Sequence, residues 1–226
     1  MPFLAYKTEY NDVNAGIWRL EEDEMYFHTR LKLYEHEWEK LSTIRHPQKR
    51  LEWLSSRLCM KELLKISHTD RIESLNNHNG KPYLSNNSHY ICYTHSQRYA
   101  AAIASPSREV GIDLEDLIRR RNPNTRRLFM DEVELSLYES EPSTELFLVI
   151  WSIKETIYKL YSQKGLSFRE DIHLQLQDHS FSQKGMIAVR IQTDTHCREY
   201  NAFYEVFPEF VITYGMAPVS PPVLVS

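Results

Sequence analysis

Apolar and polar positions in the first half of the chain predict a strand, two helices and then two more strands. Residues 16–20 form a short apolar segment, and 21–41 has a helical composition with an acidic first turn, as helix N-termini prefer. In residues 46–66, leucines recur at helical spacing after Pro47, which suits a helix start. Residues 89–94 and 98–104 read as strands joined by a tight link, and the segment before them, 76–88, is rich in turn residues.

The second half repeats this succession. A strand pattern at 111–117 leads through a mixed helical stretch, 122–140, to the strongly helical 143–161. Trp151 lies in that helix much as Trp53 lies in the first half. Four strand candidates follow, at residues 172–177, 186–192, 201–207 and 210–215. We therefore expect an α+β protein of two similar halves, 1–108 and 109–226, each with an antiparallel sheet and packed helices.

Composition narrows the class of protein. The 226 residues are 42 % hydrophobic and 26 % charged, as in a globular protein with a substantial core. The net charge of −4 provides no general attraction for nucleic acid or an anionic membrane. No segment resembles a signal peptide or a membrane span. Three widely spaced cysteines, Cys59, Cys92 and Cys197, fit a reducing compartment, so we expect a cytoplasmic protein.

Two carboxylates on one side of a predicted strand are the first sign of chemistry. In "GIDLED", Asp113 and Glu115 alternate with apolar residues and point to the same face, where like charges repel unless a cation or solvent separates them. The helix at 143–161 adds Glu155, flanked by Lys154 and Lys159. Taken alone, Glu155 and Lys159 are better explained as an exposed ion pair on this helix, since they are four positions apart. Together, three carboxylates and two lysines suit a divalent metal and a phosphoryl group.

Basic residues of the first half suggest a second set of phosphate contacts. No glycine-rich phosphate loop is present, so bound phosphates would need separated cationic donors. The candidates lie on or beside the helix at 46–66 and in two turns: Lys49, Arg50, Arg57, Lys81 and His95. Taken singly, each is better explained as a solvated charge or a turn-stabilising side chain. The basic run at 119–127 reads as a solvated loop, or else as a contact for an acidic protein.

Four motifs in order resemble the Sfp-like 4'-phosphopantetheinyl transferases. They are "GKP" at 80–82, "THS" at 94–96, "GIDLE" at 111–115 and "WSIKETIYK" at 151–159. The resemblance covers about Lys49 to Leu166 and implies a fused pseudo-dimer with the site at the junction of its halves. It also implies transfer of phosphopantetheine from coenzyme A to a serine of an apo-acyl or peptidyl carrier protein, with release of 3',5'-ADP. Mg²⁺, or else Mn²⁺, would be required, and we expect a monomer that binds neither nucleic acid nor membrane.

The resemblance also assigns roles to individual residues. Asp113, Glu115 and Glu155 would hold the metal, and Glu155 would take the serine proton. Lys159 and Lys154 would steady the pyrophosphate. The nucleotide phosphates would contact residues of the first half: Thr94, His95, Lys81, Arg50, Lys49 and Arg57. Gln97 departs from the family pattern because a glycine usually follows the "S-H-S" turn.

Two other functions stay open at this stage. A metal-dependent nuclease could use the same carboxylates, although the net charge and the lack of a long basic surface count against it. A catalytically silent relative could retain the fold and bind carrier proteins only. Retention of all three carboxylates and both lysines disfavours that reading.

Overall fold

The computed structural model describes residues 3–67, 72–118, 122–176 and 181–219. Its first half contains three helices and six strands: β1 (Phe3–Lys7), β2 (Asn14–Arg19), α1 (Glu24–Arg30), α2 (Glu35–Thr43), α3 (Pro47–Leu64), β3 (Ser74–Asn76), β4 (Pro82–Leu84), β5 (Tyr90–His95) and β6 (Tyr99–Ser105). The second half contains β7 (Arg108–Asp116), η1 (Pro123–Leu128), α4 (Glu132–Ser140), α5 (Thr144–Tyr161), β8 (Ile172–Leu174), β9 (Lys184–Gln192), β10 (Cys197–Val206) and β11 (Phe210–Pro218). The predicted α+β class is confirmed.

The strands form two antiparallel sheets whose orders follow one rule. The first sheet runs β1-β2-β6-β5-β4-β3, and the second runs β7-β11-β10-β9-β8. In each, the strand before the helices pairs with the last strand of its half, and the remaining strands follow in reverse order of the sequence. The first sheet has β1 as an additional edge strand. The long helices α3 and α5 therefore occupy equivalent places in the two successions.

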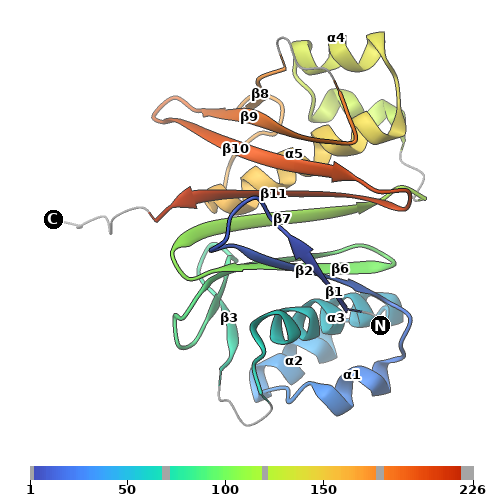
Figure 1. Ribbon diagram of the computed structural model, residues 1–226, viewed down its shortest axis with the longest axis vertical. Helices are drawn as coiled ribbons and strands as arrows, with labels where there is room; N and C mark the ends of the chain where they lie inside the picture. The colour runs from blue at the N-terminus through green and yellow to red at the C-terminus, as the bar shows by residue number, and fades with distance from the viewer. Residues whose placement is uncertain (1–2, 68–71, 119–121, 177–180, 220–226) are drawn as a thin grey trace, which may run out of the picture.

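Each sheet packs one face on helices and the other on the opposite sheet. Under α3, the core contains Trp18, Leu54, Ile91 and alternate alanines of β6. Under α5, it contains Ile153, Ile157 and the apolar side of β9 and β10. A third core joins the halves, where Ile103 of β6 meets residues of β7 and β11. Along the long axis, Figure 1 shows α1, α2 and α3 at one end and α4 at the other, with the sheets between.

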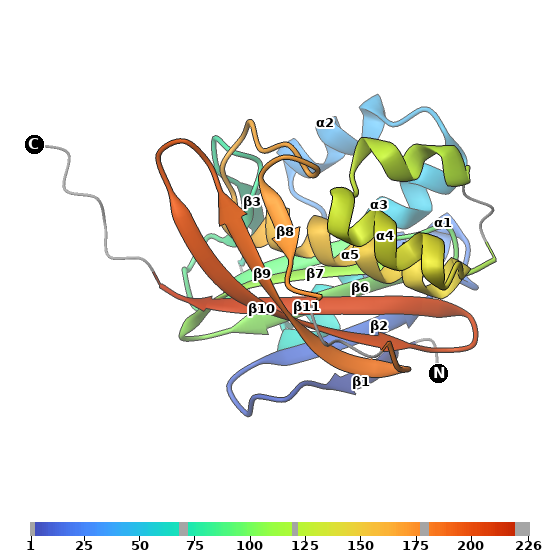
Figure 2. The ribbon, with the colours of Figure 1, turned by 90° about the horizontal axis from the view of Figure 1, so that it is seen from above.

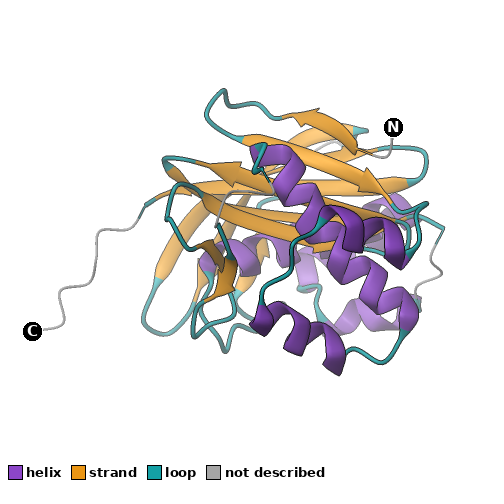
Figure 3. Ribbon diagram, turned by 90° about the horizontal axis from the view of Figure 1, so that it is seen from below, coloured by secondary structure: helices purple, strands orange, loops and turns teal. Residues whose placement is uncertain are grey.

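Strand β6 illustrates why its sequence is so apolar. All seven residues of "YAAAIAS" are buried, because one face meets α3 and the other meets the second half. Small side chains let these layers approach closely. In the second half, Gly111 of β7 serves the same purpose: a Cβ there would lie 2.5 Å from the carbonyl oxygen of Thr156 on α5. Figures 2 and 3, views along the long axis from opposite ends, show the helices gathered toward one side of the molecule.

Two predicted segments differ from the structure. The helix expected at 21–41 is split into α1 and α2, because the chain becomes extended at Leu31 and restarts at Tyr34. The restart is fixed by reciprocal hydrogen bonding between Tyr34 and Glu37 at the start of α2. Within the turn-rich 76–88, the structure also forms the short strand β4. Among the helices of the described ranges, none has the length and apolar character needed to cross a bilayer.

Candidate active site

A cleft of about 530 Å³ opens at the junction of the two halves, between α3 and α5. The first half contributes α3, the 76–82 turn and the end of β5, while the second contributes β7, α5 and the segment after α5. Eight of the predicted site residues line it: Arg57, Lys81, Thr94, His95, Asp113, Glu115, Glu155 and Lys159. Residues separated by up to about a hundred positions therefore meet in one place.

Asp113 is the most enclosed carboxylate of the cleft, with 5 % of its surface exposed. One of its oxygens accepts hydrogen bonds from Lys159 Nζ at 2.7 Å and from Thr94 Oγ1 at 2.9 Å. The other accepts from Ser152 Oγ at 2.9 Å. Since Thr94 belongs to β5 and Lys159 to α5, Asp113 connects β7 with two other elements that line the cleft. Three donors around a buried carboxylate fix its position and orientation in the cleft.

Lys159 supplies a positive charge beside this carboxylate. Its ammonium also approaches Thr94 Oγ1 at 3.1 Å and the carbonyl of Ile112 at 3.2 Å. Burial disfavours the charged amine, but attraction to Asp113 and to Glu155 outweighs burial and raises the pKa of Lys159. About a quarter of the side chain (26 %) remains exposed. The amine is thus a stable cation that faces the cleft.

Glu115 and Glu155 complete the acidic lining. Glu115 lies two residues beyond Asp113 on β7 and accepts a hydrogen bond from Trp151 Nε1 at 2.7 Å. The Trp151 ring is itself fixed between Phe129 and Phe168, with ring centroids 5.1 and 5.5 Å away. Glu155 follows Trp151 by one helical turn, so its side chain projects from α5 on the same side.

The first half brings cationic and imidazole groups to the opposite wall. His95 Nδ1 lies 3.0 Å from Glu52 Oε2, a carboxylate that is almost fully buried behind it. Burial would raise the pKa of Glu52, but hydrogen bonds from His95 and Lys49 outweigh it and lower that pKa. The guanidinium of Arg57 lies 3.3 Å over the Trp53 ring. A rigid imidazole and a stacked guanidinium are suitable donors to phosphate.

Lys81 bridges the two halves at the edge of the cleft. Its ammonium lies 2.6 Å from Glu109 at the start of β7 and 3.4 Å from the carbonyl of Leu160 at the end of α5. This residue of the "GKP" turn is therefore both a cleft residue and a contact between the halves.

Lys154 does not lie in the cleft, which corrects its predicted role as a phosphate contact. It is completely buried and pairs with Glu134 of α4 at 2.7 Å. It also donates to the carbonyls of Phe168 and Ile172, both at 2.7 Å. Burial lowers the pKa of Lys154 and raises that of Glu134, and their mutual attraction opposes both shifts. Lys154 ties the segment after α5 to the core.

Arg50 and Lys49 are not among the residues that line the cleft, so the structure does not bring these two predicted phosphate contacts together with the others. Arg50 is engaged by the Glu24 carboxylate of α1 and by the carbonyl of Leu41 at 2.8 Å, and so connects α1, α2 and α3. Lys49 pairs with Glu52 at 2.6 Å and is largely exposed. Gln97, the departure from the family pattern, has its carbonyl held by Gln48 at 2.6 Å.

The three predicted metal ligands share one cleft without forming a closed coordination site. Over the residues that the structure describes, no three histidine, cysteine or acidic side chains are close enough together to hold a metal ion. The donor chemistry nevertheless suits a hard divalent cation, since Asp113, Glu115 and Glu155 bring only carboxylate oxygens.

Several residues of the site were missed by the sequence reasoning. Ser152, Thr156 and Thr213 form a completely buried hydroxyl network below Asp113, with Thr156 and Thr213 oxygens 2.6 Å apart. Ser152 and Thr156 are four apart in a helix that is apolar for most of its length, which is a signal for a shared polar partner. The contact between Glu52 and His95 gave no such signal, because the two residues are distant in sequence.

Comparison with family models identifies a related family. Residues 109–214 match the family model for the 4'-phosphopantetheinyl transferase superfamily. No curated protein matches the chain. The matched residues include β7 and α5, which bear Asp113, Glu115, Glu155 and Lys159.

Proposed function

We propose that this chain, whose residues 109–214 belong to the 4'-phosphopantetheinyl transferase superfamily, moves the 4'-phosphopantetheine of coenzyme A onto a serine of an apo-carrier protein. The observation that carries the proposal is the convergence of Asp113, Glu115, Glu155 and Lys159 with Thr94 and His95 in one cleft. Acidic and basic groups at such close range suit transfer of a phosphoryl group.

The reaction is a substitution at phosphorus. The serine oxygen forms a bond to the β-phosphorus of coenzyme A, and the bridging P–O bond breaks. The leaving 3',5'-ADP takes the bonding electron pair. The serine proton passes to Glu155, whose carboxylate lines the cleft on α5. The carrier then bears phosphopantetheine through a phosphodiester.

Positively charged and hydrogen-bond-donating side chains from both halves would bind the phosphates of coenzyme A. Lys159, a cation held beside Asp113, would face the pyrophosphate and neutralise charge on the leaving group. His95, Lys81 and Arg57 line the first-half wall and would bind the nucleotide phosphates. Thr94 would orient Asp113 and Lys159, since it hydrogen-bonds both.

Asp113, Glu115 and Glu155 would hold a divalent cation, for which their oxygen donors are suited. Mg²⁺ or Mn²⁺ bound there would neutralise the pyrophosphate and orient it for attack. The role of Trp151 would be to fix the Glu115 carboxylate through its indole N–H.

The two halves would have different functions in the reaction. Residues 1–108 would receive the nucleotide side of coenzyme A, and residues 109–226 would provide the metal-binding and catalytic carboxylates. The matching sheet orders support a fused pseudo-dimer with its site at the junction. We further propose a cytoplasmic monomer that acts on acyl or peptidyl carrier proteins.

Intact-protein mass spectrometry of an apo-acyl carrier protein tests the proposal. With coenzyme A and Mg²⁺, the carrier should gain the mass of one phosphopantetheine, and EDTA or Glu155→Gln should abolish the gain. A panel of apo-acyl and apo-peptidyl carrier proteins that all remain unmodified would contradict the proposal. Release of nucleotides from DNA without coenzyme A would instead favour a metal-dependent nuclease.

A further inference from the structure

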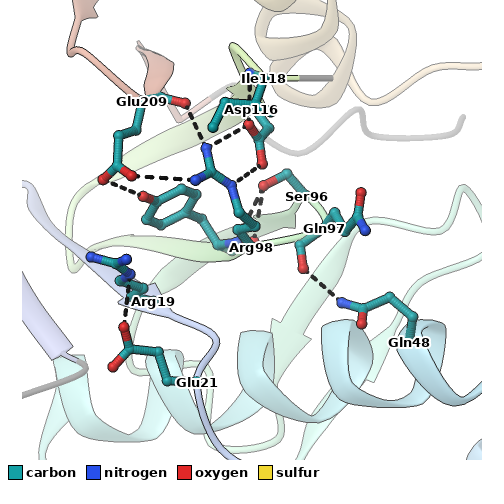
Figure 4. Close-up of polar contacts among 10 residues, drawn as sticks. Arg19, Glu21, Gln48, Ser96, Gln97, Arg98, Asp116, Ile118 and Glu209 are labelled. Carbon is teal, nitrogen blue, oxygen red and sulfur yellow. Dashed lines mark hydrogen bonds and ion pairs between the residues drawn. The ribbon is translucent and has the colours of Figure 1, made fainter. Parts of the chain in front are cut away.

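Arg98 lies in the turn between β5 and β6 and clamps the first half to the second. Its guanidinium donates two hydrogen bonds to Asp116 at the end of β7, from Nε at 2.7 Å and from Nη2 at 2.8 Å. It also reaches Glu209, in the turn between β10 and β11, through the carboxylate at 3.2 Å and the carbonyl at 3.3 Å. Figure 4 shows Arg98 between these two acidic residues.

The geometry of this contact is more restrictive than that of a surface ion pair. Asp116 is only 3 % exposed, and its oxygen Oδ1 also accepts the backbone N–H of Ile118. Two parallel bonds between a guanidinium fork and a carboxylate fix orientation as well as distance. Tyr99 adds a hydrogen bond from its hydroxyl to Glu209 at 2.8 Å. The clamp therefore holds the β5–β6 turn at a set position against β7.

The same two segments carry the residues of the cleft. His95 precedes Arg98 by three positions, and Asp113 precedes Asp116 by three positions. On the side of α3, Gln48 holds the carbonyl of Gln97 in the same turn (Figure 4). Neither Arg98 nor Asp116 lines the cleft, so any effect on it passes through the chain segments that they join.

We propose that Arg98 and Asp116 are positioning residues, which set the end of β5 that bears His95 relative to β7 and its Asp113, so that both walls of the cleft engage one coenzyme A. This inference rests on the proposed function. Its direct consequence is that loosening the clamp weakens nucleotide binding before it unfolds the protein.

The primary test is Arg98→Met, which removes the fork and retains much of the apolar stem. We expect binding of 3',5'-ADP, measured by titration calorimetry, to weaken about tenfold, because small displacements of positioned groups are costly. The KM for coenzyme A should rise while the KM for the carrier stays constant. A purely structural loss would instead reduce the active fraction, with both KM values unchanged. Arg98→Lys keeps the positive charge but not the two parallel hydrogen bonds. Its affinity for 3',5'-ADP should lie between those of wild type and Arg98→Met.

Lys184→Met supplies a matched control. Lys184 of β9 pairs with Glu9 of the first half at 2.8 Å, so it is also a cation that joins the halves, but it does not line the cleft. Its loss should leave 3',5'-ADP affinity unchanged.

A double-mutant cycle with His95→Ala tests whether Arg98 affects 3',5'-ADP binding by positioning His95 or independently of it. If Arg98 acts by positioning His95, the combined variant should bind 3',5'-ADP no more weakly than His95→Ala alone. Fully additive losses, or unchanged affinity and KM in folded Arg98→Met and Arg98→Lys, would overturn the inference while wild-type transfer stands. Wild-type protein that neither binds 3',5'-ADP nor modifies any carrier would overturn the proposed function together with it.

Discussion

The charged residues of α5 have two different roles. The two lysines of the 151–159 motif show this, because one is buried in the core and the other faces the cleft. Lys154 faces Glu134 inside the second half, while Lys159 faces Asp113 in the cleft. Lys154 and Glu155 are adjacent in sequence and so lie about 100° apart around the helix axis. One of them can face the cleft while the other faces the core.

Substituting the two lysines should therefore give opposite outcomes. Lys154→Met should destabilise the protein by about 3–5 kcal/mol, because it leaves the Glu134 carboxylate buried without its charged partner. Lys159→Met should abolish carrier modification with much less effect on stability. Urea unfolding and the mass-spectrometric transfer assay measure the two effects. The double variant Lys154→Met/Glu134→Gln should recover part of the lost stability, because glutamine removes the unpaired charge and keeps an acceptor for the backbone N–H of Leu174. A Lys154→Met protein as stable as wild type would contradict this assignment.

A second residue-scale prediction concerns Trp151. Trp151→Phe keeps an aromatic ring between Phe129 and Phe168 but removes the donor to Glu115. Partners that orient a metal ligand typically contribute about 10- to 100-fold in metal affinity or activity, so the Mg²⁺ concentration for half-maximal transfer should rise by that range. Trp18→Phe is the matched control, because Trp18 also donates to a carboxylate, Glu22, away from the cleft. An equal Mg²⁺ requirement in wild type and Trp151→Phe would refute the role.

How far the sequence could identify these residues depends on the kind of signal. Strand alternation placed Asp113 and Glu115 on one side of β7, and both do line the cleft. Arg50 could not be placed by such reasoning, since the acid that engages it, Glu24, comes from another helix. The buried partners of His95 and Arg98 are likewise known only once the chain is folded.

At the scale of elements, the ion pair between α1 and α3 should make stability depend on pH. Hydrogen bonds from Arg50 are the largest cause that lowers the pKa of Glu24, from 4.5 to about 2. A folded-state pKa below the unfolded value means that the pair stabilises the fold above about pH 4.5 and loses this contribution as pH falls toward 2.

The stability difference between wild type and Glu24→Gln should accordingly be largest near neutral pH and shrink in acid. Urea unfolding at a series of pH values from about 3 to 7 measures this difference. In an Arg50→Met background, the same comparison should show a weaker pH dependence, because the stronger donor has been removed and only His28 remains to lower the pKa of Glu24. A difference that stays constant down to pH 3 would show that the pair does not link α1 to the rest of the fold.

Elements with strong periodicity were predicted well, and those fixed by local capping were not. The leucine spacing of 46–66 and the apolar 143–161 correspond to α3 and α5, and both helices are buried over most of their central turns. The division of 21–41 into α1 and α2 depends on the Glu37 carboxylate, which accepts the backbone N–H of Tyr34, and composition does not reveal this contact. The short strand β4 forms because β5 offers it an edge.

At the scale of the whole molecule, the two halves share a core rather than packing as separate domains. Val13, Ile17 and Ile103 of the first half are buried against Ile112 and Ile212 of the second. Ion pairs at Lys81 and Arg98 cross the same boundary at the two ends of β7. Separating the halves would expose this apolar layer to water, at about 25 cal/mol for each Å² uncovered.

Such an arrangement should unfold as one unit. Differential scanning calorimetry of the full chain should give a single transition whose calorimetric and van't Hoff enthalpies agree. Ile103→Ala, which truncates a completely buried side chain of the shared layer, should lower stability by about 2–5 kcal/mol and keep the transition single. Leu148→Ala, in the core of the second half alone, should do the same if the halves are coupled, since both halves would then melt at the lowered temperature. Two separable transitions in Leu148→Ala, with only one of them shifted, would mean that residues 1–108 and 109–226 fold independently and that the cleft between them is free to open.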